Sequence, residues 1–208
     1  MSCVALTTAA RWHEGNWAAH AARALSVVLG ADAVIFVLQP IVDRDWSVKA
    51  SLPLALCDVA LVVAAIACWT RRALLVELTY FWGLAGTLQA VATPDLTVRF
   101  PHLEFFEYTI AHVGIVYAAI YLVVGLRIRP RRGSVPRVFA ITAAYTAFVG
   151  LFDAVTGADY MFLAARPATW SLLSILGPWP WYVVSAAGLA FVLLTALDAP
   201  FWRARRPA

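Results

Sequence analysis

Cys57 and His112 are the two residues whose types best fit nucleophilic chemistry. A thiol becomes a strong nucleophile when it loses its proton, and a nearby imidazole can accept that proton. At about 1.5 Å per helical residue, Cys57 lies about 7 Å and His112 about 10 Å from the start of its apolar stretch. The two are therefore predicted at similar depth, as a cysteine nucleophile and its base. The simpler alternatives are a cysteine that only packs and a histidine that only links two helices.

Further polar residues fall in the same half of their apolar stretches: Asp58, Gln89, Glu107 and Asp153. A charged side chain costs at least about 2.5 kcal/mol at the centre of a membrane helix, so those that persist usually face protein or water. We expect Asp58, Glu107 or Gln89 to orient the imidazole. Because polar groups in lipid need partners, we also expect four side chains to converge on one cavity. These are Cys57, Gln89, His112 and Asp153.

Two other functions are compatible with the same residues. A small transporter or ligand-binding membrane protein would use Glu107, His112 and Asp153 in an outward-facing polar pocket. A proton or ion path would use Asp32 together with Glu107 and Asp153. A scaffold subunit of a larger assembly is the third alternative, since it needs none of these residues.

The sequence indicates no metal centre and no cofactor. It contains no HExxH, GxSxG or Walker-type motif. His102 and His112 are ten residues apart, with no second ligand at helical spacing. The three cysteines, Cys3, Cys57 and Cys68, form no CxxC pair. We therefore assign no metal ligand, and the FWGLAG segment is expected to use its glycines for helix packing.

The elements that must position these residues are transmembrane helices. The chain is 62% hydrophobic and 13% charged, with a mean hydropathy of +0.77, whereas soluble domains are about 25% charged. Six stretches reach the roughly 20 apolar residues that a membrane-spanning helix needs. They are Trp17–Gln39, Leu52–Trp69, Ala73–Val91, Phe105–Leu126, Arg137–Val155 and Trp179–Asp198. The fold class is therefore an all-α polytopic bundle, with 1–208 as a single membrane domain.

Basic residues are distributed unevenly between the two sides of this predicted bundle. Ten arginines lie at 71–72, 127–137 and 203–206, against four basic residues on the other side. Arginine-rich connections stay in the cytoplasm during insertion. We therefore expect a multi-pass cell-membrane protein with a cytoplasmic lead-in at 1–16 and a cytoplasmic tail at 199–208. The arginines lie in short connections between apolar runs, so nucleic acid is not expected as a partner, and membrane lipids are.

The loop at 156–178 and its continuation are rich in proline and tryptophan. In the GPWPWY segment, aromatic residues follow each proline. They are Trp179, Trp181 and Tyr182. Tryptophan favours the headgroup zone, which predicts an aromatic belt. Proline restricts the backbone, which predicts a rigid lid over an outward-facing cavity.

Three segments resemble a known family. They are LPLALCD at 52–58, FWGLAGTLQAVATPDLTVRFPHLEFFEYTIAHVGIV at 81–116, and a segment from Asp159–Tyr160–Met161 to LGPWPWY at 176–182. Together they resemble the YwaF-like bacterial integral membrane proteins, which are related to the eukaryotic transmembrane protein 164 family. The resemblance implies a bundle that usually has seven spans, whereas this chain shows six and begins where the second is expected.

The resemblance also implies an activity. The eukaryotic relatives look like acyltransferases that move a fatty acyl chain between phospholipids through a cysteine acyl-enzyme. In this chain the matching residues are Cys57 in LPLALCD and His112 in FEYTIAHVG. The implied enzyme is a phospholipid acyltransferase or acyl hydrolase that acts on the outer-leaflet side without a cofactor. Backbone N–H groups or Gln89 would hold the oxyanion.

Overall fold

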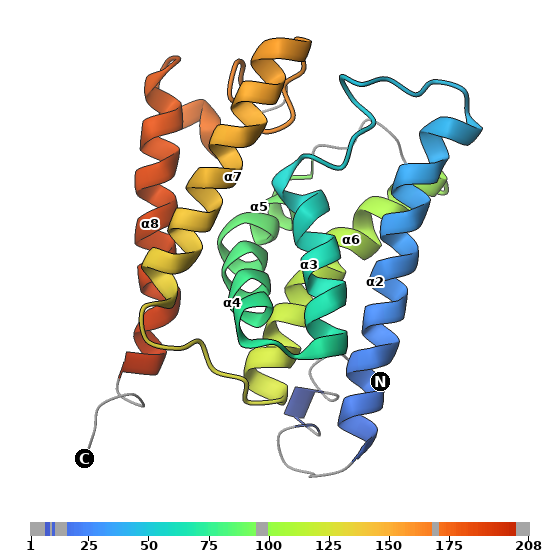
Figure 1. The fold of residues 1–208 in the computed structure, drawn as a ribbon, viewed down its shortest axis with the longest axis vertical. Helices are drawn as coiled ribbons and strands as arrows, with labels where there is room; N and C mark the ends of the chain where they lie inside the picture. The colour runs from blue at the N-terminus through green and yellow to red at the C-terminus, as the bar shows by residue number, and fades with distance from the viewer. Residues whose placement is uncertain (1–6, 9, 11–15, 95–99, 168–170, 203–208) are drawn as a thin grey trace.

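The computed structural model describes residues 7, 8, 10, 16–94, 100–167 and 171–202, and within them it contains helices and no strand (Figure 1). The elements in chain order are α2 (Asn16–Val42), α3 (Leu56–Thr70), α4 (Ala73–Phe81), η1 (Trp82–Thr87), α5 (Leu88–Ala92), α6 (Leu103–Ile120), η2 (Tyr121–Gly125), α7 (Ser134–Thr156), η3 (Leu172–Ile175) and α8 (Trp181–Trp202). The predicted all-α membrane bundle is confirmed.

Five of these helical segments are long and apolar enough to cross a membrane: α2, α4 to α5, α6 to η2, α7 and α8. The sixth, α3, has 15 residues and begins at Leu56 rather than at the predicted Leu52. Pro53 lacks a backbone N–H and restricts the residue before it, which explains the later start. As a result the upper end of α3 lies below those of α2 and α7 (Figure 1).

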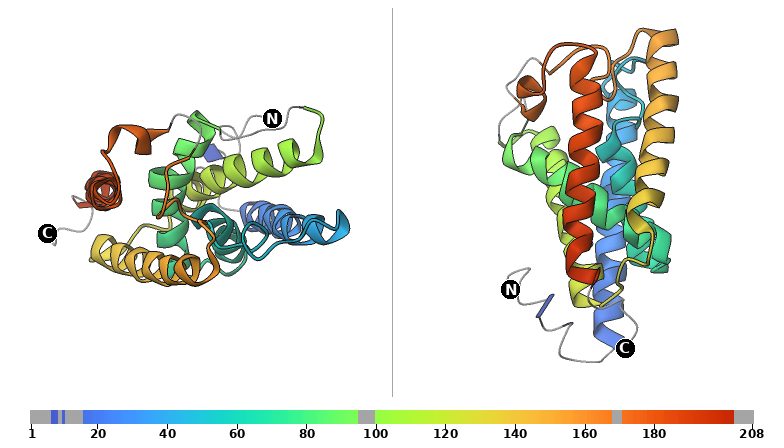
Figure 2. Two further views of the ribbon diagram at one scale, coloured as in Figure 1. Left: turned by 90° about the horizontal axis from the view of Figure 1, so that it is seen from above. Right: turned by 90° about the vertical axis from the view of Figure 1, so that its left-hand side faces the viewer.

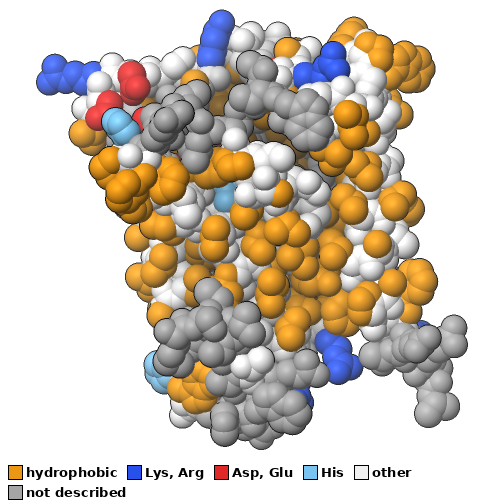
Figure 3. Space-filling model, turned by 180° about the vertical axis from the view of Figure 1, so that it is seen from behind, with side chains coloured by type: hydrophobic (Ala, Val, Ile, Leu, Met, Phe, Trp, Pro, Cys, Tyr) orange, Lys and Arg blue, Asp and Glu red, His pale blue; other side chains and the backbone are white. Residues whose placement is uncertain are grey.

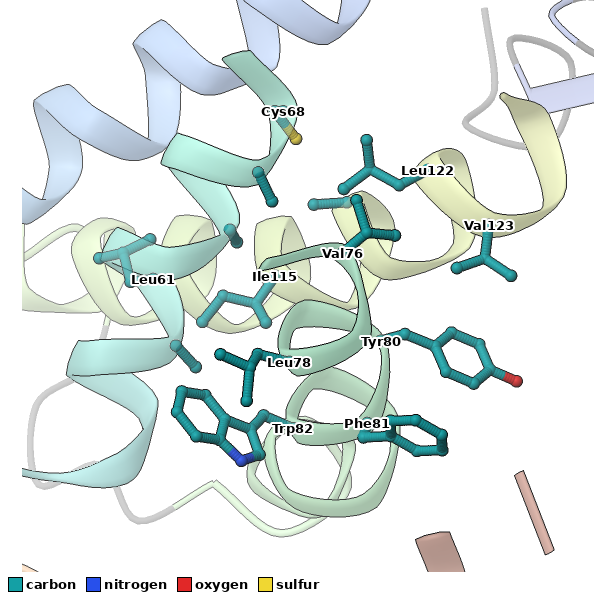
Figure 4. Close-up of a cluster of buried hydrophobic side chains, with 14 of the residues drawn as sticks. Leu61, Cys68, Val76, Leu78, Tyr80, Phe81, Trp82, Ile115, Leu122 and Val123 are labelled. Carbon is teal, nitrogen blue, oxygen red and sulfur yellow. The ribbon is translucent and has the colours of Figure 1, made fainter. Parts of the chain in front are cut away.

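The helices form a closely packed group and an outlying pair. α2 packs on α3 and α6, while α3, α4 and α6 enclose the central apolar core. Leu61, Phe81, Ile115 and Leu122 contribute to this core (Figure 4). α7 and α8 pack on each other and reach the rest mainly through α4 and η1, so they lie to one side of the molecule when it is seen from above (Figure 2, left).

Successive helices run in alternating directions, which separates the connections into two sets. The segments 71–72 and 126–133 lie at the lower end in Figure 1, with the end of α8. The loop 43–55 and the segments 157–167 and 171–180 lie at the upper end. On the face shown in Figure 3, hydrophobic side chains cover the middle, and charged side chains lie near the two ends. α8 continues to Trp202, so residues 199–202 of the predicted tail are helical; residues 203–208 lie outside the described part.

Glu77 fixes the connection at 126–133 to α4. Its side chain is 1% exposed and accepts hydrogen bonds at 2.9 Å from both the backbone N–H and Nε of Arg131. Arg137 Nη1 donates a further bond of 2.6 Å. The hydrogen bond and the charge of Glu77 raise the pKa of Arg131, which lies outside the spans. Both oxygens of this buried carboxylate therefore accept hydrogen bonds that hold the connection, which is a structural role.

Candidate functional site

Cys57 lies on the first turn of α3, half-buried, with its Sγ 4.0 Å from Oγ1 of the buried Thr87. The first N–H groups of a helix have no partner within the helix. Within the described residues, the N–H groups of Leu56 and Cys57 find no acceptor elsewhere. A thiol, a hydroxyl and two available N–H donors therefore meet at the positive end of a helix dipole, a place that stabilises anions.

Asp58 is committed to the start of the helix. Its Oδ2 accepts a hydrogen bond of 3.0 Å from the N–H of Ala55, which is the N-cap residue. This bond fixes the turn that presents Cys57. The structure thus places Asp58 beside the thiol as a positioning group, and the predicted role in orienting an imidazole has no supporting contact.

Thr87 reaches Cys57 because η1 is a π-helix. Its wider turn interrupts the α-helical course between α4 and α5, and such turns are frequent at functional sites. A methyl group on Gly83 would lie 3.2 Å from Ala119 Cβ of α6, and one on Gly86 would lie 3.8 Å from Leu56 Cδ2. The predicted packing role is therefore confirmed for Gly83, and Gly86 brings η1 against the first residue of α3.

A cavity of about 440 Å³ lies next to this pair, between η1, α7, α8 and the loop above them. We call it the α7–α8 cavity. Its lining residues are Leu56, Phe81, Trp82, Ala85, Gly86, Phe139, Thr142, Ala143, Thr146, Ala147, Met161, Phe162, Leu163, Leu173, Tyr182, Val183, Ala186, Ala187, Ala190 and Leu194. Leu56 and Gly86 are the chain neighbours of Cys57 and Thr87, so the cavity wall lies one residue along the chain from the candidate nucleophile and from its hydroxyl partner.

The polar groups in the cavity wall are mostly used within the wall. Trp82 Nε1 donates a 2.8 Å hydrogen bond to Thr142 Oγ1, which in turn donates to Val138 O. The hydroxyl of Tyr182 donates to Phe162 O. The interior is therefore mainly carbon, and it suits an apolar ligand better than water or an ion.

His112 is held by its own helix. Nδ1 lies 2.8 Å from Tyr108 O, and the two rings stack with centroids 3.9 Å apart. A carbonyl can only accept, so Nδ1 carries the proton and Nε2 keeps a lone pair suited to a base. Among the described residues no hydrogen bond joins His112 to Cys57. The structure therefore does not bring the predicted nucleophile and base into contact.

The other predicted pocket residues are dispersed. Gln89 is exposed, and Glu107 is half-buried, where it interacts electrostatically with Asp32 and Asp58. Asp153 is buried, and one of its oxygens accepts a 3.1 Å hydrogen bond from the N–H of Tyr160. None of Cys57, Gln89, His112 and Asp153 lines the α7–α8 cavity. Local hydrogen bonds hold His112 and one oxygen of Asp153, and the other oxygen of Asp153 is buried without a partner among the described residues.

Two of the three predicted lid residues contact the loop above the cavity. Tyr182 is buried and lines the cavity, and Trp179 Nε1 donates a 3.1 Å hydrogen bond to Leu163 O. This bond and the one from the Tyr182 hydroxyl to Phe162 O hold the loop at 162–163 in place. The side chains of Phe162 and Leu163 also line the cavity. Trp181 is exposed and does not line it, as expected for an aromatic belt.

Some site residues were not singled out from the sequence. The alanines on the cavity side of α7 and α8 look like ordinary membrane-helix residues, and their one signal is the run of small residues at 185–188. Trp82 likewise lies in the FWGLAG segment, for which the sequence predicts only helix packing. Within the ranges described, no group of three or more His, Cys, Asp or Glu residues is placed to hold a metal ion.

Comparison with known proteins gives the family. An uncharacterised protein of Treponema pallidum (strain Nichols) is 29% identical over 161 residues, which cover 76% of this chain and 64% of that protein. The chain thus matches less than two thirds of that relative's length. No solved structure matches. The model of the TMEM164 family matches residues 1–198. This chain belongs to the TMEM164 family.

Proposed function

We propose that this protein is a lipid-modifying membrane enzyme that transfers a fatty acyl chain from a membrane lipid to Cys57 and then to an acceptor. One observation carries the proposal: the Cys57 thiol lies on the first turn of α3, beside available N–H groups, and its chain neighbour Leu56 lines an apolar cavity. The resemblance of LPLALCD and FEYTIAHVG to a family with cysteine acyl-enzymes supports the same chemistry.

The proposed reaction has two halves. The Cys57 thiolate attacks the ester carbonyl carbon, and the oxyanion that forms is stabilised by the N–H groups of Leu56 and Cys57. The carbon–oxygen bond of the ester then breaks, the lysolipid leaves with a proton, and a thioester remains on Cys57. The hydroxyl of an acceptor lipid, or water, attacks this thioester and regenerates the thiol.

His112 is the proposed base and acid. Its Nε2 is the nitrogen available to take the thiol proton and return it to the leaving lysolipid. Contacts between catalytic groups are often longer in free enzymes than in the complex with substrate, so the proposal expects Nε2 to approach Cys57 directly or through one water. Thr87 would hold the sulfur in place during this transfer.

The test compares two cysteines of the same helix. Purified protein in nanodiscs is given a phospholipid with a fluorescent acyl chain, and acyl transfer and release are measured for Cys57→Ala and for Cys68→Ala. Cys68 is fully buried in the core and has no role in the proposal. Loss of activity in Cys57→Ala alone is the expected result. Full activity in Cys57→Ala would contradict a cysteine mechanism.

A second candidate, proton or ion binding, is favoured by one observation. Asp32 is 3% exposed in the middle of α2, and its Oδ2 has no hydrogen-bond partner among the described residues. It interacts electrostatically with Glu107 of α6. Buried carboxylates of this kind often mark ion pathways. This function predicts that Asp32→Asn, and not Cys57→Ala, abolishes proton flux into liposomes measured with a pH-sensitive dye.

A further inference from the structure

The α7–α8 cavity has the length of one acyl chain. Its lining on α8 extends from Tyr182 to Leu194, twelve residues later, which is about 18 Å at about 1.5 Å per residue. The hydrocarbon core of a bilayer is about 30 Å thick, so one leaflet contributes chains of about 15 Å. The cavity is therefore long enough for one chain of a single leaflet, aligned with the helices.

The cavity lining combines small residues in the middle of α7 and α8 with large side chains below them. The small residues are Ala143 and Ala147 of α7 and Ala186 and Ala190 of α8. The lowest lining residue of each helix is large instead. These three residues are Phe81 of α4, Phe139 of α7 and Leu194 of α8. Since α4 and α7 run upward and α8 downward in Figure 1, each of the three is the lowest lining residue of its own segment. We therefore take them as the floor of the cavity.

Two lining residues of the cavity are chain neighbours of the candidate nucleophile and of its hydroxyl partner. Leu56 and Gly86 line the cavity and are the direct neighbours of Cys57 and Thr87. The cavity is partly open and lies at the seam between the α7–α8 pair and the α4–η1 segment, since residues of both line it. A lipid whose chain enters this seam would thus place its ester near Cys57, with the chain pointing away from the thiol.

We infer that the α7–α8 cavity binds one fatty acyl chain of a membrane lipid in extended form, with its methyl end at the floor formed by Phe81, Phe139 and Leu194. The inference rests on the proposed function for the chemistry at Cys57. It adds which part of the lipid substrate is bound and which residues limit the length of its acyl chain. An apolar cavity of this size suits apolar ligands, because water would find few free polar partners in its wall.

The inference predicts which residues select chain length. Ala190 lies about one turn above Leu194 on α8, so Ala190→Phe would raise the floor. Ala196, on the same helix, is exposed and does not line the cavity, so Ala196→Phe is the matched control. We expect Ala190→Phe to shift preference to chains shorter by several carbons, with about tenfold weaker binding of the original chain, because an overfilled site excludes it.

The experiment uses full-length protein carrying Cys57→Ala, so that binding is seen without chemistry. A phosphatidylcholine with a diazirine near the methyl end of one acyl chain is incorporated into nanodiscs and activated by light, and cross-linked peptides are identified by mass spectrometry. The expected cross-links lie at 139–143 of α7 and 190–194 of α8. They are lost in Ala190→Phe and in a second filling variant, Ala143→Phe, and retained in Ala196→Phe.

Cross-links only at lipid-facing positions such as Val184 and Val192, unchanged by either filling variant, would overturn the inference. The two proposals fail separately. Loss of the cavity cross-links while unsubstituted protein still forms an acyl adduct on Cys57 contradicts the chain site alone. Cavity cross-links without any adduct on Cys57 contradict the proposed enzyme and leave a lipid-binding protein.

Discussion

The residue with the most direct influence on the candidate nucleophile is Thr87. Its hydroxyl is buried and lies 4.0 Å from Cys57 Sγ. We predict that Thr87→Val, which keeps the shape but removes the hydroxyl, slows alkylation of Cys57 about tenfold, because a hydrogen bond to a charged group contributes about 1.5–3 kcal/mol. Labelling rates are read by mass spectrometry. Thr195→Val is the control, since the hydroxyl of Thr195 bonds only to its own helix. Equal rates in both variants would show that Thr87 does not support the thiolate.

Glu77 holds the connection at 126–133 against α4 at the lower end of the bundle. Glu77→Gln leaves Arg131 and Arg137 without their carboxylate, but their side chains are 51% and 35% exposed and can regain water. We therefore predict a loss of about 1–3 kcal/mol, below the roughly 3–5 kcal/mol of a fully buried broken pair. Thermal unfolding in detergent measures it. Glu104→Gln, at an exposed position of α6, should change little.

At the scale of elements, the contact between η1 and α6 depends on Gly83. A methyl group there would already lie 3.2 Å from Ala119 Cβ and 3.3 Å from Ile115 Cγ2. We predict that Gly83→Val destabilises the protein by about 1–3 kcal/mol, the usual cost of overpacking. Gly188→Val is the matched control, because nothing lies within 4 Å of that position. Similar unfolding temperatures for both variants would argue against a close contact at η1.

The helices were predictable from the sequence because lipid imposes long apolar stretches, and each predicted span has its helix. The sequence predicts the start of α3 four residues too early, because the residues from Leu52 to Ala55 continue the apolar stretch. Pro53 restricts the backbone there, and the helix begins only at Leu56. The π-helix η1 was not predictable, since composition does not reveal a change from an α-turn to a wider one. That turn brings Thr87 beside Cys57, so the sequence alone did not predict Thr87 as the partner of the thiol.

The candidate site was predicted in part. Depth alone correctly placed Cys57 near the upper end of its helix, but depth cannot fix which face of a helix a side chain occupies. His112 therefore turned out to bond to Tyr108 rather than to Cys57, and Gln89 turned out to be exposed. The α7–α8 cavity depends on how far α7 and α8 stand from α4, which no local pattern encodes.

At the scale of the whole molecule, orientation follows from the arginines. The segments 71–72 and 126–133 lie at one end of the bundle, and the loop containing Arg166 lies at the other. We predict that the arginine-rich end is cytoplasmic. A reporter fusion truncated after Arg132 should show cytoplasmic activity, and one after Arg166 should show activity outside. The reverse pair of results would invert the assignment and place Cys57 near the inner surface.

The acyl-enzyme on Cys57 is the central claim, and one measurement tests it most directly. The unsubstituted protein is incubated with a phospholipid that carries an isotopically labelled acyl chain, quenched in acid and analysed by peptide mass spectrometry. The account predicts a labelled acyl group on Cys57 that neutral hydroxylamine removes, and none on Cys68. Acyl transfer that proceeds with Cys57 unmodified, or a labelled adduct found only elsewhere in the chain, would contradict it.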